Sequence, residues 1–179
     1  FTVMLIGGGS TIGIFEPVAE ALMALEARWP TRLQLVVVCG TDARMQSRLS
    51  RRAGHLSSTG RVLGFIEYLP AVMAATDLLV AKAGGLIVSE ALAHGLPMVL
   101  YHAIPGQEEA NAEYVTRHGA AVLAESPDRV CSTVQRALQD PLDPIPETLG
   151  PAAQAVVLDG VARLGDLRRA SALASVTPS

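Results

Sequence analysis

Two stretches of this chain place glycines directly before polar side chains at the expected start of a helix. They are residues 82–90, which contain the pair Gly84 and Gly85, and residues 105–111, which begin with Pro-Gly. The first N–H groups of a helix have no partner within it and carry partial positive charge, and glycine lets an anion approach them closely. The sequence therefore predicts two places where anions or sugar hydroxyl groups could bind.

In the first stretch, Glu90 falls in the first or second turn of a helix that is expected to begin at Leu86. A carboxylate there can accept two hydrogen bonds from a vicinal diol such as that of a ribose. It can equally complement the positive end of its helix, which contributes about 0.3–1 kcal/mol. Spacing alone leaves these two interpretations equal.

In the second stretch, Gln107, Glu108 and Asn111 share one face of the expected helix. Their amide and carboxylate groups could face a sugar, because the sharp Pro-Gly entry turns the following side chains toward the sheet edge. The alternative is a solvated acidic first turn that stabilises its own helix. Taken alone, this stretch favours the alternative.

A third glycine-rich loop, Gly-Gly-Gly-Ser-Thr-Ile-Gly, follows the first expected strand. Around Gly8, Gly9 and Ser10 a phosphate could approach the backbone closely. A dinucleotide fingerprint would require glycine where Ile12 stands, and a P-loop would require lysine where Ile14 stands. Alone, the loop is as consistent with a tight strand-to-helix turn as with a ligand site.

Short apolar runs alternate with longer stretches of helical period, which is typical of a parallel sheet covered by helices on both faces. We expect strands at residues 2–6, 33–38, 61–64, 78–81, 98–101 and 120–123, and helices at 15–28, 42–52, 69–75, 86–94, 107–118 and 128–139. The predicted fold class is α/β, with a doubly wound, mostly parallel, six-stranded Rossmann-like sheet. In such sheets ligands bind outside the carboxyl ends of the strands, where all three glycine loops fall.

Residues 1–139 are expected to form this ligand-binding domain, followed by a Pro-rich linker at 140–150. A final helix within 151–174 has one apolar face, at Val157, Val161 and Leu164. Packing of this helix back on the domain is favoured over a membrane or partner helix.

Composition excludes several classes of protein. The chain has 179 residues, is 50% hydrophobic and carries a net charge of −3, with scattered arginines, so nucleic acid is not expected as a partner. Cys39 and Cys131 form no disulfide framework, and a reducing cytoplasmic setting fits best. We find neither metal-ligand spacing nor a serine nucleophile elbow. Because Phe1 already belongs to an expected strand, we expect the chain to be a piece of something longer.

Four motifs together carry a family resemblance: Gly-Phe-Ile-Glu-Tyr-Leu at 64–69, residues 77–92, Gly-Leu-Pro-Met at 95–98, and Pro-Gly-Gln-Glu-Glu-Ala-Asn at 105–111. In order and spacing they resemble the C-terminal half of glycosyltransferase family 28, over roughly residues 2–139. That family includes diacylglycerol glycosyltransferases of the monogalactosyldiacylglycerol synthase type. It also includes the enzyme that adds N-acetylglucosamine to the lipid-linked peptidoglycan precursor. The Pro-Gly-Gln-Glu form resembles the diacylglycerol branch.

The resemblance implies an inverting hexosyltransferase of the two-lobed GT-B fold, in which this lobe binds a UDP-sugar. The other, N-terminal lobe would bind a lipid acceptor such as diacylglycerol and supply the general base, so the isolated chain is expected to transfer nothing. No metal and no cofactor would be needed. The full-length protein would lie peripherally at the cytoplasmic face of a membrane.

The resemblance also implies a role for each donor-site residue. Phe65 and the backbone of Ile66 would hold uracil; the residues alone are consistent with an apolar slot for a flat base or with a core position. The ribose hydroxyls would bind Glu90. The diphosphate would face the backbone of Gly8, Gly9, Ser10, Gly84, Gly85 and Leu86, and the donor hexose would face Gln107, Glu108 and Asn111.

Other functions stay open at this point. An N-acetylglucosamine transferase acting on a lipid-linked cell-wall precursor and a non-catalytic nucleotide-sugar-binding domain would share these motifs. UDP-N-acetylglucosamine 2-epimerases share the architecture, but this chain lacks their usual Arg-Glu-rich segment at residues 102–111. A nicotinamide-binding domain is disfavoured by the incomplete glycine fingerprint.

Overall fold

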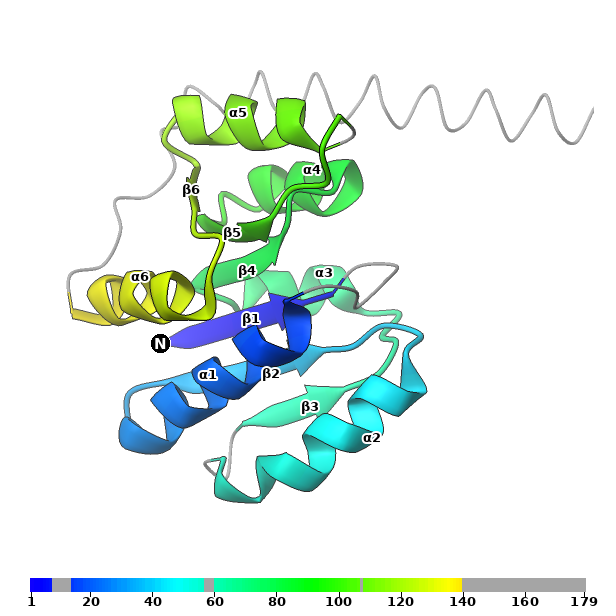
Figure 1. The fold of residues 1–179 in the computed structure, drawn as a ribbon, viewed down its shortest axis with the longest axis vertical. Helices are drawn as coiled ribbons and strands as arrows, with labels where there is room; N and C mark the ends of the chain where they lie inside the picture. Colours follow the sequence, from blue (N-terminus) through cyan, green and yellow to red (C-terminus); the bar gives the residue numbers. More distant parts are fainter. Residues whose placement is uncertain (8–13, 57–59, 107, 140–179) are drawn as a thin grey trace, which may run out of the picture.

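The computed structural model describes residues 1–7, 14–56, 60–106 and 108–139. Within them the chain forms a six-stranded sheet in which all strand pairs are parallel (Figure 1). The strand order is β3-β2-β1-β4-β5-β6. The strands are Thr2–Ile6 (β1), Gln34–Val38 (β2), Arg61–Leu63 (β3), Leu78–Lys82 (β4), Met98–His102 (β5) and Ala121–Leu123 (β6).

Helices connect successive strands, as right-handed parallel crossovers require. They are Phe15–Arg28 (α1), Ala43–Arg52 (α2), the 3-10 turn Ala53–His55 (η1), Leu69–Ala74 (α3), Gly85–Ala93 (α4), Glu109–Arg117 (α5) and Pro127–Gln139 (α6). The predicted α/β class is confirmed, and the expected elements end within two residues of their predicted bounds. The sheet is fully parallel rather than mostly parallel. The turn η1 was not predicted as a separate element, because it directly follows the last residue of α2 and continues its helical pattern.

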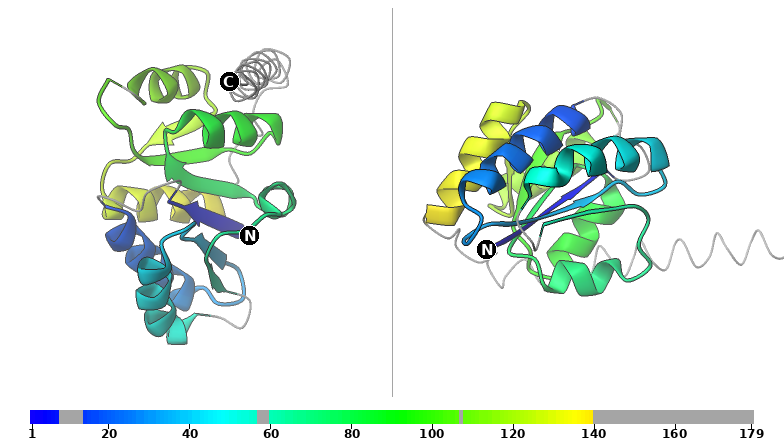
Figure 2. Two further views of the ribbon diagram at one scale, coloured as in Figure 1. Left: turned by 90° about the vertical axis from the view of Figure 1, so that its right-hand side faces the viewer. Right: turned by 90° about the horizontal axis from the view of Figure 1, so that it is seen from below.

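The sheet is buried on both faces because its side chains alternate between two apolar layers. Val3 and Leu5 of β1 belong to the core beneath α1, α2 and α6. Met4 and Ile6 belong to the core beneath α3, α4 and α5. Figure 2 shows these two sets of helices on opposite sides of the sheet. This double burial explains why the strands are runs of apolar residues instead of alternating patterns.

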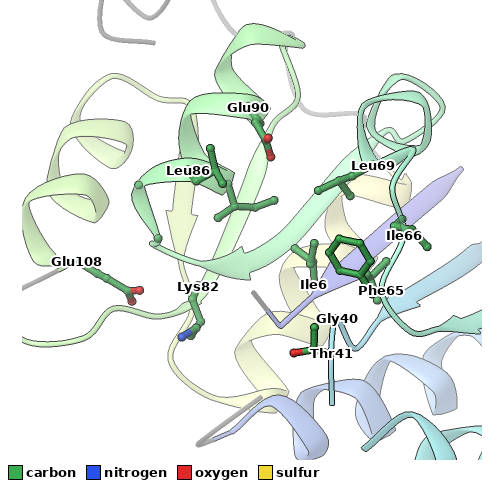
Figure 3. Close-up of a pocket in the computed structure, with 14 residues that line it drawn as sticks. Ile6, Gly40, Thr41, Phe65, Ile66, Leu69, Lys82, Leu86, Glu90 and Glu108 are labelled. Carbon is green, nitrogen blue, oxygen red and sulfur yellow. The ribbon is translucent and has the colours of Figure 1, made fainter. Parts of the chain in front are cut away.

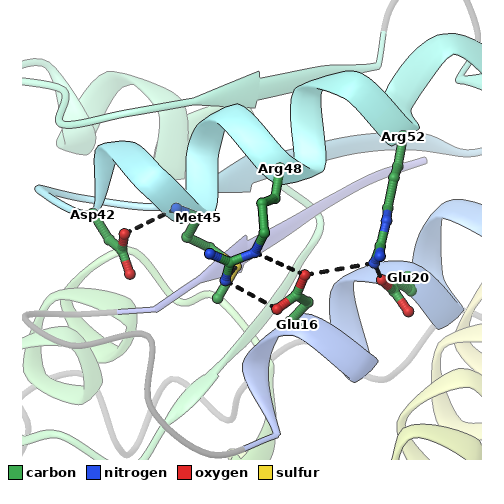
Figure 4. Close-up of polar contacts among 6 residues, drawn as sticks. All are labelled: Glu16, Glu20, Asp42, Met45, Arg48 and Arg52. Carbon is green, nitrogen blue, oxygen red and sulfur yellow. Dashed lines mark hydrogen bonds and ion pairs between the residues drawn. The ribbon is translucent and has the colours of Figure 1, made fainter.

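An ion-pair network fastens α2 to α1 (Figure 4). Arg48 donates from Nε and Nη2 to the two carboxylate oxygens of Glu16, at 3.1 and 3.0 Å. Arg52 pairs with Glu16 and with Glu20. The hydrogen bond from Arg48 holds the pKa of Glu16 below its ordinary value of 4.5. Asp42 caps the start of α2 by accepting a backbone N–H, which fixes the loop between β2 and α2.

Several predicted features lie outside the described residues. They are Gly8, Gly9 and Ser10 of the first glycine loop, Gln107, the linker at 140–150 and the final helix within 151–174. They stay predictions.

In the part of the chain that the structure describes, no helix is both long enough and apolar enough to cross a membrane.

Candidate donor-binding site

A pocket of about 510 Å³ opens at the carboxyl ends of the central strands (Figure 3). The strand order reverses here, because β1 lies between β2 and β4 and successive crossovers leave it in opposite directions. Ligands of doubly wound sheets bind at such a switch point. The described residues therefore form a pocket at the location that the sequence predicts for the site.

One end of the pocket is apolar and is made by the segment after β3. Phe65, Ile66 and Leu69 line it together with Ile6 of β1. The Phe65 residue is 69% exposed, so a core position is the wrong interpretation for it. Ile66 does pack against the core on the α3 side while also lining the pocket. An exposed ring above an apolar floor is the kind of surface on which a flat heterocycle can stack.

Glu90 lines the pocket from the second turn of α4. Its pKa is raised above the ordinary 4.5 because burial penalises the charged carboxylate, an effect that neighbouring His94 partly offsets. A helix dipole acts most strongly within the first turn, and Glu90 lies beyond that turn. Its partly buried place at the pocket wall therefore favours the diol-binding interpretation. His94 ends α4 through its backbone N–H and its Nδ1, which lies 2.8 Å from the Glu90 carbonyl oxygen.

The pair Gly84 and Gly85 brings the start of α4 to the pocket. Gly84, the N-cap residue, has φ −67° and ψ 137°, a conformation open to any residue. A Cβ at Gly84 would lie 3.6 Å from Glu108 Oε1, and a Cβ at Gly85 would lie 3.6 Å from Asn111 Nδ2, both ordinary contact distances. The fold itself does not require glycine at either position. The missing side chains leave the first N–H groups of α4, which no side chain caps, open to a ligand.

Glu108 and Asn111 each hold a loop at the edge of the sheet, Glu108 the loop between β5 and α5 and Asn111 the loop between β4 and α4. The buried Glu108 carboxylate accepts the Ile104 N–H at 3.0 Å, and Asn111 Nδ2 donates to the Ala83 carbonyl at 3.0 Å. The alternative interpretation, in which these side chains belong to a solvated first turn, is therefore wrong for Glu108 and for Asn111. It fits Glu109 instead, whose carboxylate accepts an exposed backbone N–H.

The structure brings together most of the predicted site residues that it describes. Those lining the pocket are Phe65, Ile66, Gly84, Gly85, Leu86, Glu90 and Glu108. Asn111 is not part of the lining but touches the loop behind it.

The sequence interpretation missed Gly40, Thr41, Leu69 and Lys82 as pocket residues. Gly40 and Thr41 follow β2 directly, so the rule that sites lie at the carboxyl ends of strands could have found them. Lys82 ends β4 at a place where the pairing register with β5 shifts. No sequence signal predicts that shift.

Among the described residues there is no group of three or more His, Cys, Asp or Glu side chains that could hold a metal ion. The Cys39 thiol is buried, which raises its pKa to about 11 and keeps it protonated.

Comparison with known proteins connects this geometry to a family. Residues 2–163 match the profile of the glycosyltransferase family 28 C-terminal domain. The chain is 33% identical over 138 residues to the processive diacylglycerol beta-glucosyltransferase of Bacillus pumilus, over 77% of this chain and 35% of that protein. It is 34% identical over 137 residues to monogalactosyldiacylglycerol synthase 1, chloroplastic, of Arabidopsis thaliana, over 74% of this chain and 25% of that protein. The chain thus spans about a third or less of the length of these relatives.

A solved structure shows the same fold. The crystal structure of Acinetobacter baumannii MurG matches with a TM-score of 0.62 and 24% identity, over 84% of this chain and 44% of that chain. This likeness supports the arrangement of sheet and helices found in C-terminal lobes of GT-B glycosyltransferases. The match of the family profile over most of the sequence identifies the chain as a member of glycosyltransferase family 28, as its C-terminal domain.

Proposed function

We propose that the chain is the donor-binding part of an inverting, UDP-sugar-dependent hexosyltransferase that glycosylates a lipid acceptor such as diacylglycerol. The order of groups along the pocket carries this proposal. An exposed aromatic ring and apolar floor lie at one end, and Lys82 and Glu108 lie at the other (Figure 3). Glu90 and the start of α4 line the space between these ends. This is the order of base, ribose, diphosphate and hexose in a nucleotide sugar.

The base and ribose would bind through complementary contacts. Phe65 offers its exposed ring to one face of uracil, and the Ile66 backbone would read the edge of the base. Glu90 would accept hydrogen bonds from the two ribose hydroxyls, which restores part of the solvation that burial removes from its carboxylate. Charged hydrogen bonds of this kind contribute about 1.5–3 kcal/mol.

The diphosphate would lie against Gly84, Gly85 and Leu86 at the start of α4. In the transfer reaction the acceptor hydroxyl oxygen attacks the anomeric carbon of the hexose. The bond from that carbon to the β-phosphate oxygen breaks, and its electron pair stays on UDP. The helix N-terminus, with about half a positive charge, stabilises the charge that develops there. The proton of the acceptor hydroxyl would pass to a general base.

The hexose and the acceptor would lie beyond the diphosphate. Gln107 and Glu108 would face the hexose, with Asn111 holding the loop beside it. The named activities of the two relatives, a diacylglycerol beta-glucosyltransferase and a monogalactosyldiacylglycerol synthase, support a lipid acceptor. Because the chain spans 35% and 25% of those proteins, we place the acceptor site and the general base in a second lobe. Gly8, Gly9 and Ser10 would complete the diphosphate site, and the whole protein would act at the cytoplasmic face of a membrane.

Calorimetric titration of the chain with UDP, a UDP-hexose and NAD tests the proposal. We expect binding of UDP and of the UDP-hexose, no binding of NAD, and no hexose transfer to diacylglycerol by the chain alone. Tight NAD binding without UDP binding would contradict the proposed function. Turnover by the chain alone would contradict the assignment of the general base to a second lobe.

A further inference from the structure

Lys82 is distinguished by its residue type and by its place at the end of β4. It is the one lysine in the whole sequence, and it ends β4 beside the switch point of the sheet. The parallel register between β4 and β5 shifts between Ala81 and Lys82. Lys82 is partly buried and lines the pocket.

The charge of Lys82 is not neutralised within the described protein. It forms no ion pair with any described residue, although two carboxylates, Glu90 and Glu108, line the same pocket. One carboxylate oxygen of Glu108 instead accepts the Ile104 N–H. Among the described residues around the pocket, Lys82 is the only cation. An ammonium that lines a pocket and has no ion-pair partner among the described residues is available to pair with an external anion.

The position of this cation indicates which anion it serves. In Figure 3 the Lys82 side chain lies on the side of the pocket away from Phe65, between Glu108 and Ile6. The start of α4, with Gly84 and Gly85, lines the same pocket and follows Lys82 in the chain after the single residue Ala83. A helix N-terminus and an ammonium are therefore close neighbours in the pocket lining, and both favour phosphate oxygens.

We propose that Lys82 binds the diphosphate of the donor nucleotide and stabilises the charge that gathers on it when the bond to the hexose breaks. This inference rests on the proposed function and adds to it a residue in direct contact with the leaving group. Lys82 acts through its positive charge, and no acid or base step is assigned to it. Lys82 accordingly selects nucleoside diphosphates over monophosphates and nucleosides.

The first test compares the binding of UDP, UMP and uridine by the wild-type chain and by Lys82→Met and Lys82→Arg. We expect Lys82→Met to lower UDP affinity roughly 10- to 150-fold, the range of a lost charged hydrogen bond, and to leave uridine affinity unchanged. Lys82→Arg should keep most of the preference for UDP. Higher salt should weaken UDP binding more in the wild type than in Lys82→Met. If Lys82→Met bound UDP with wild-type affinity, the role of Lys82 would be overturned and the proposed function would stand.

A second test needs no variant. Because Lys82 is the one lysine of the sequence, an amine-acetylating reagent can modify a single side chain of the chain. Uridine serves as the control ligand, because it has no phosphate. We expect UDP to slow acetylation of Lys82 and uridine not to slow it.

The outcomes separate the two proposals. Acetylation of Lys82 at the same rate with and without saturating UDP would overturn the inference while leaving the nucleotide site intact. A wild-type chain that binds neither UDP nor uridine would instead overturn the proposed function, and the role of Lys82 with it.

Discussion

The Asn111 side chain donates a hydrogen bond from Nδ2 to the carbonyl oxygen of Ala83, at 3.0 Å. This contact joins the first turn of α5 to the loop that leads from β4 into α4. Ala83 is fully buried, so its carbonyl has no access to water. The residue predicted to face a sugar is thus also a structural support for the loop that would hold the diphosphate.

Asn111→Ala should lower the free energy of unfolding by about 1–3 kcal/mol, because it leaves the buried Ala83 carbonyl without its donor. Urea denaturation measures this change. Glu113→Ala is the matched control on the same helix: its carboxylate is exposed and, within the part of the chain that the structure describes, pairs with Arg117 alone, so a change within about 0.5 kcal/mol is expected. Equal stability of the two variants would show that the Asn111 contact contributes nothing.

Glu90 should make nucleoside binding dependent on pH. Uridine is the suitable ligand because it has no phosphate that titrates in acid. Hydroxyl donors favour the ionised carboxylate, so uridine affinity should fall as the pH is lowered through the pKa of Glu90. Since burial raises that pKa, the fall should begin above the pH expected for an ordinary glutamate of pKa 4.5.

Glu90→Gln should remove this pH dependence and weaken uridine binding about 10-fold at pH 7, the difference between a charged and a neutral hydrogen bond. In the free protein the raised pKa favours the neutral carboxyl at low pH, and this stabilisation is lost as the pH rises through it. Glu90→Gln should therefore be no less stable than the wild type at pH 7. Glu113→Gln, an exposed control, should bind uridine normally. If Glu90→Gln bound uridine with unchanged affinity, Glu90 would only complement the positive end of its own helix.

Gly85→Ala should fold normally and bind nucleotide more weakly. The added methyl group has room within the protein, where its nearest neighbour is Asn111 Nδ2 at 3.6 Å, but it would occupy space at the start of α4. Steric conflict of this kind costs about 1–3 kcal/mol, or roughly 5- to 150-fold in UDP affinity by calorimetry. Gly54→Ala is the control, because a Cβ there meets nothing within 4 Å. Normal UDP binding by a folded Gly85→Ala would place the phosphates elsewhere.

Phe65→Ala should weaken uridine binding by about 1–3 kcal/mol, the contribution of an aromatic ring stacked on a base. Its stability should change by less than about 0.5 kcal/mol, because the residue is 69% exposed. Tyr68→Ala is a matched control: this aromatic residue is 58% exposed and does not line the pocket. If both variants bound uridine equally well, the apolar end would not be the base site.

Much of the fold could be predicted because the strands are buried on both faces and therefore stand out as apolar runs. β1 and α1 have the bounds that the sequence predicts, Thr2–Ile6 and Phe15–Arg28. The glycine junctions pointed to the edge of the sheet at which the pocket lies, because the ends of the strands in a parallel sheet are fixed by the strands themselves.

Details of the site depend on contacts between residues distant in sequence, and local patterns do not encode them. Asn111 reaches a carbonyl 28 residues away, and Glu108 turns inward although its neighbour Glu109 is exposed. Lys82 is placed by a shift in register between two strands. The exposure of Phe65 follows from the path of the chain after β3. Apolar composition alone would assign this residue to the core.

A crystal structure of the chain with UDP tests the central claim most directly, because that claim is an order of groups along one pocket. We predict uracil on the Phe65 ring, the ribose hydroxyls within hydrogen-bond distance of Glu90, and the diphosphate at Gly84 and Gly85 with Lys82 against it. UDP bound in the reverse direction, or outside this pocket, would contradict the account.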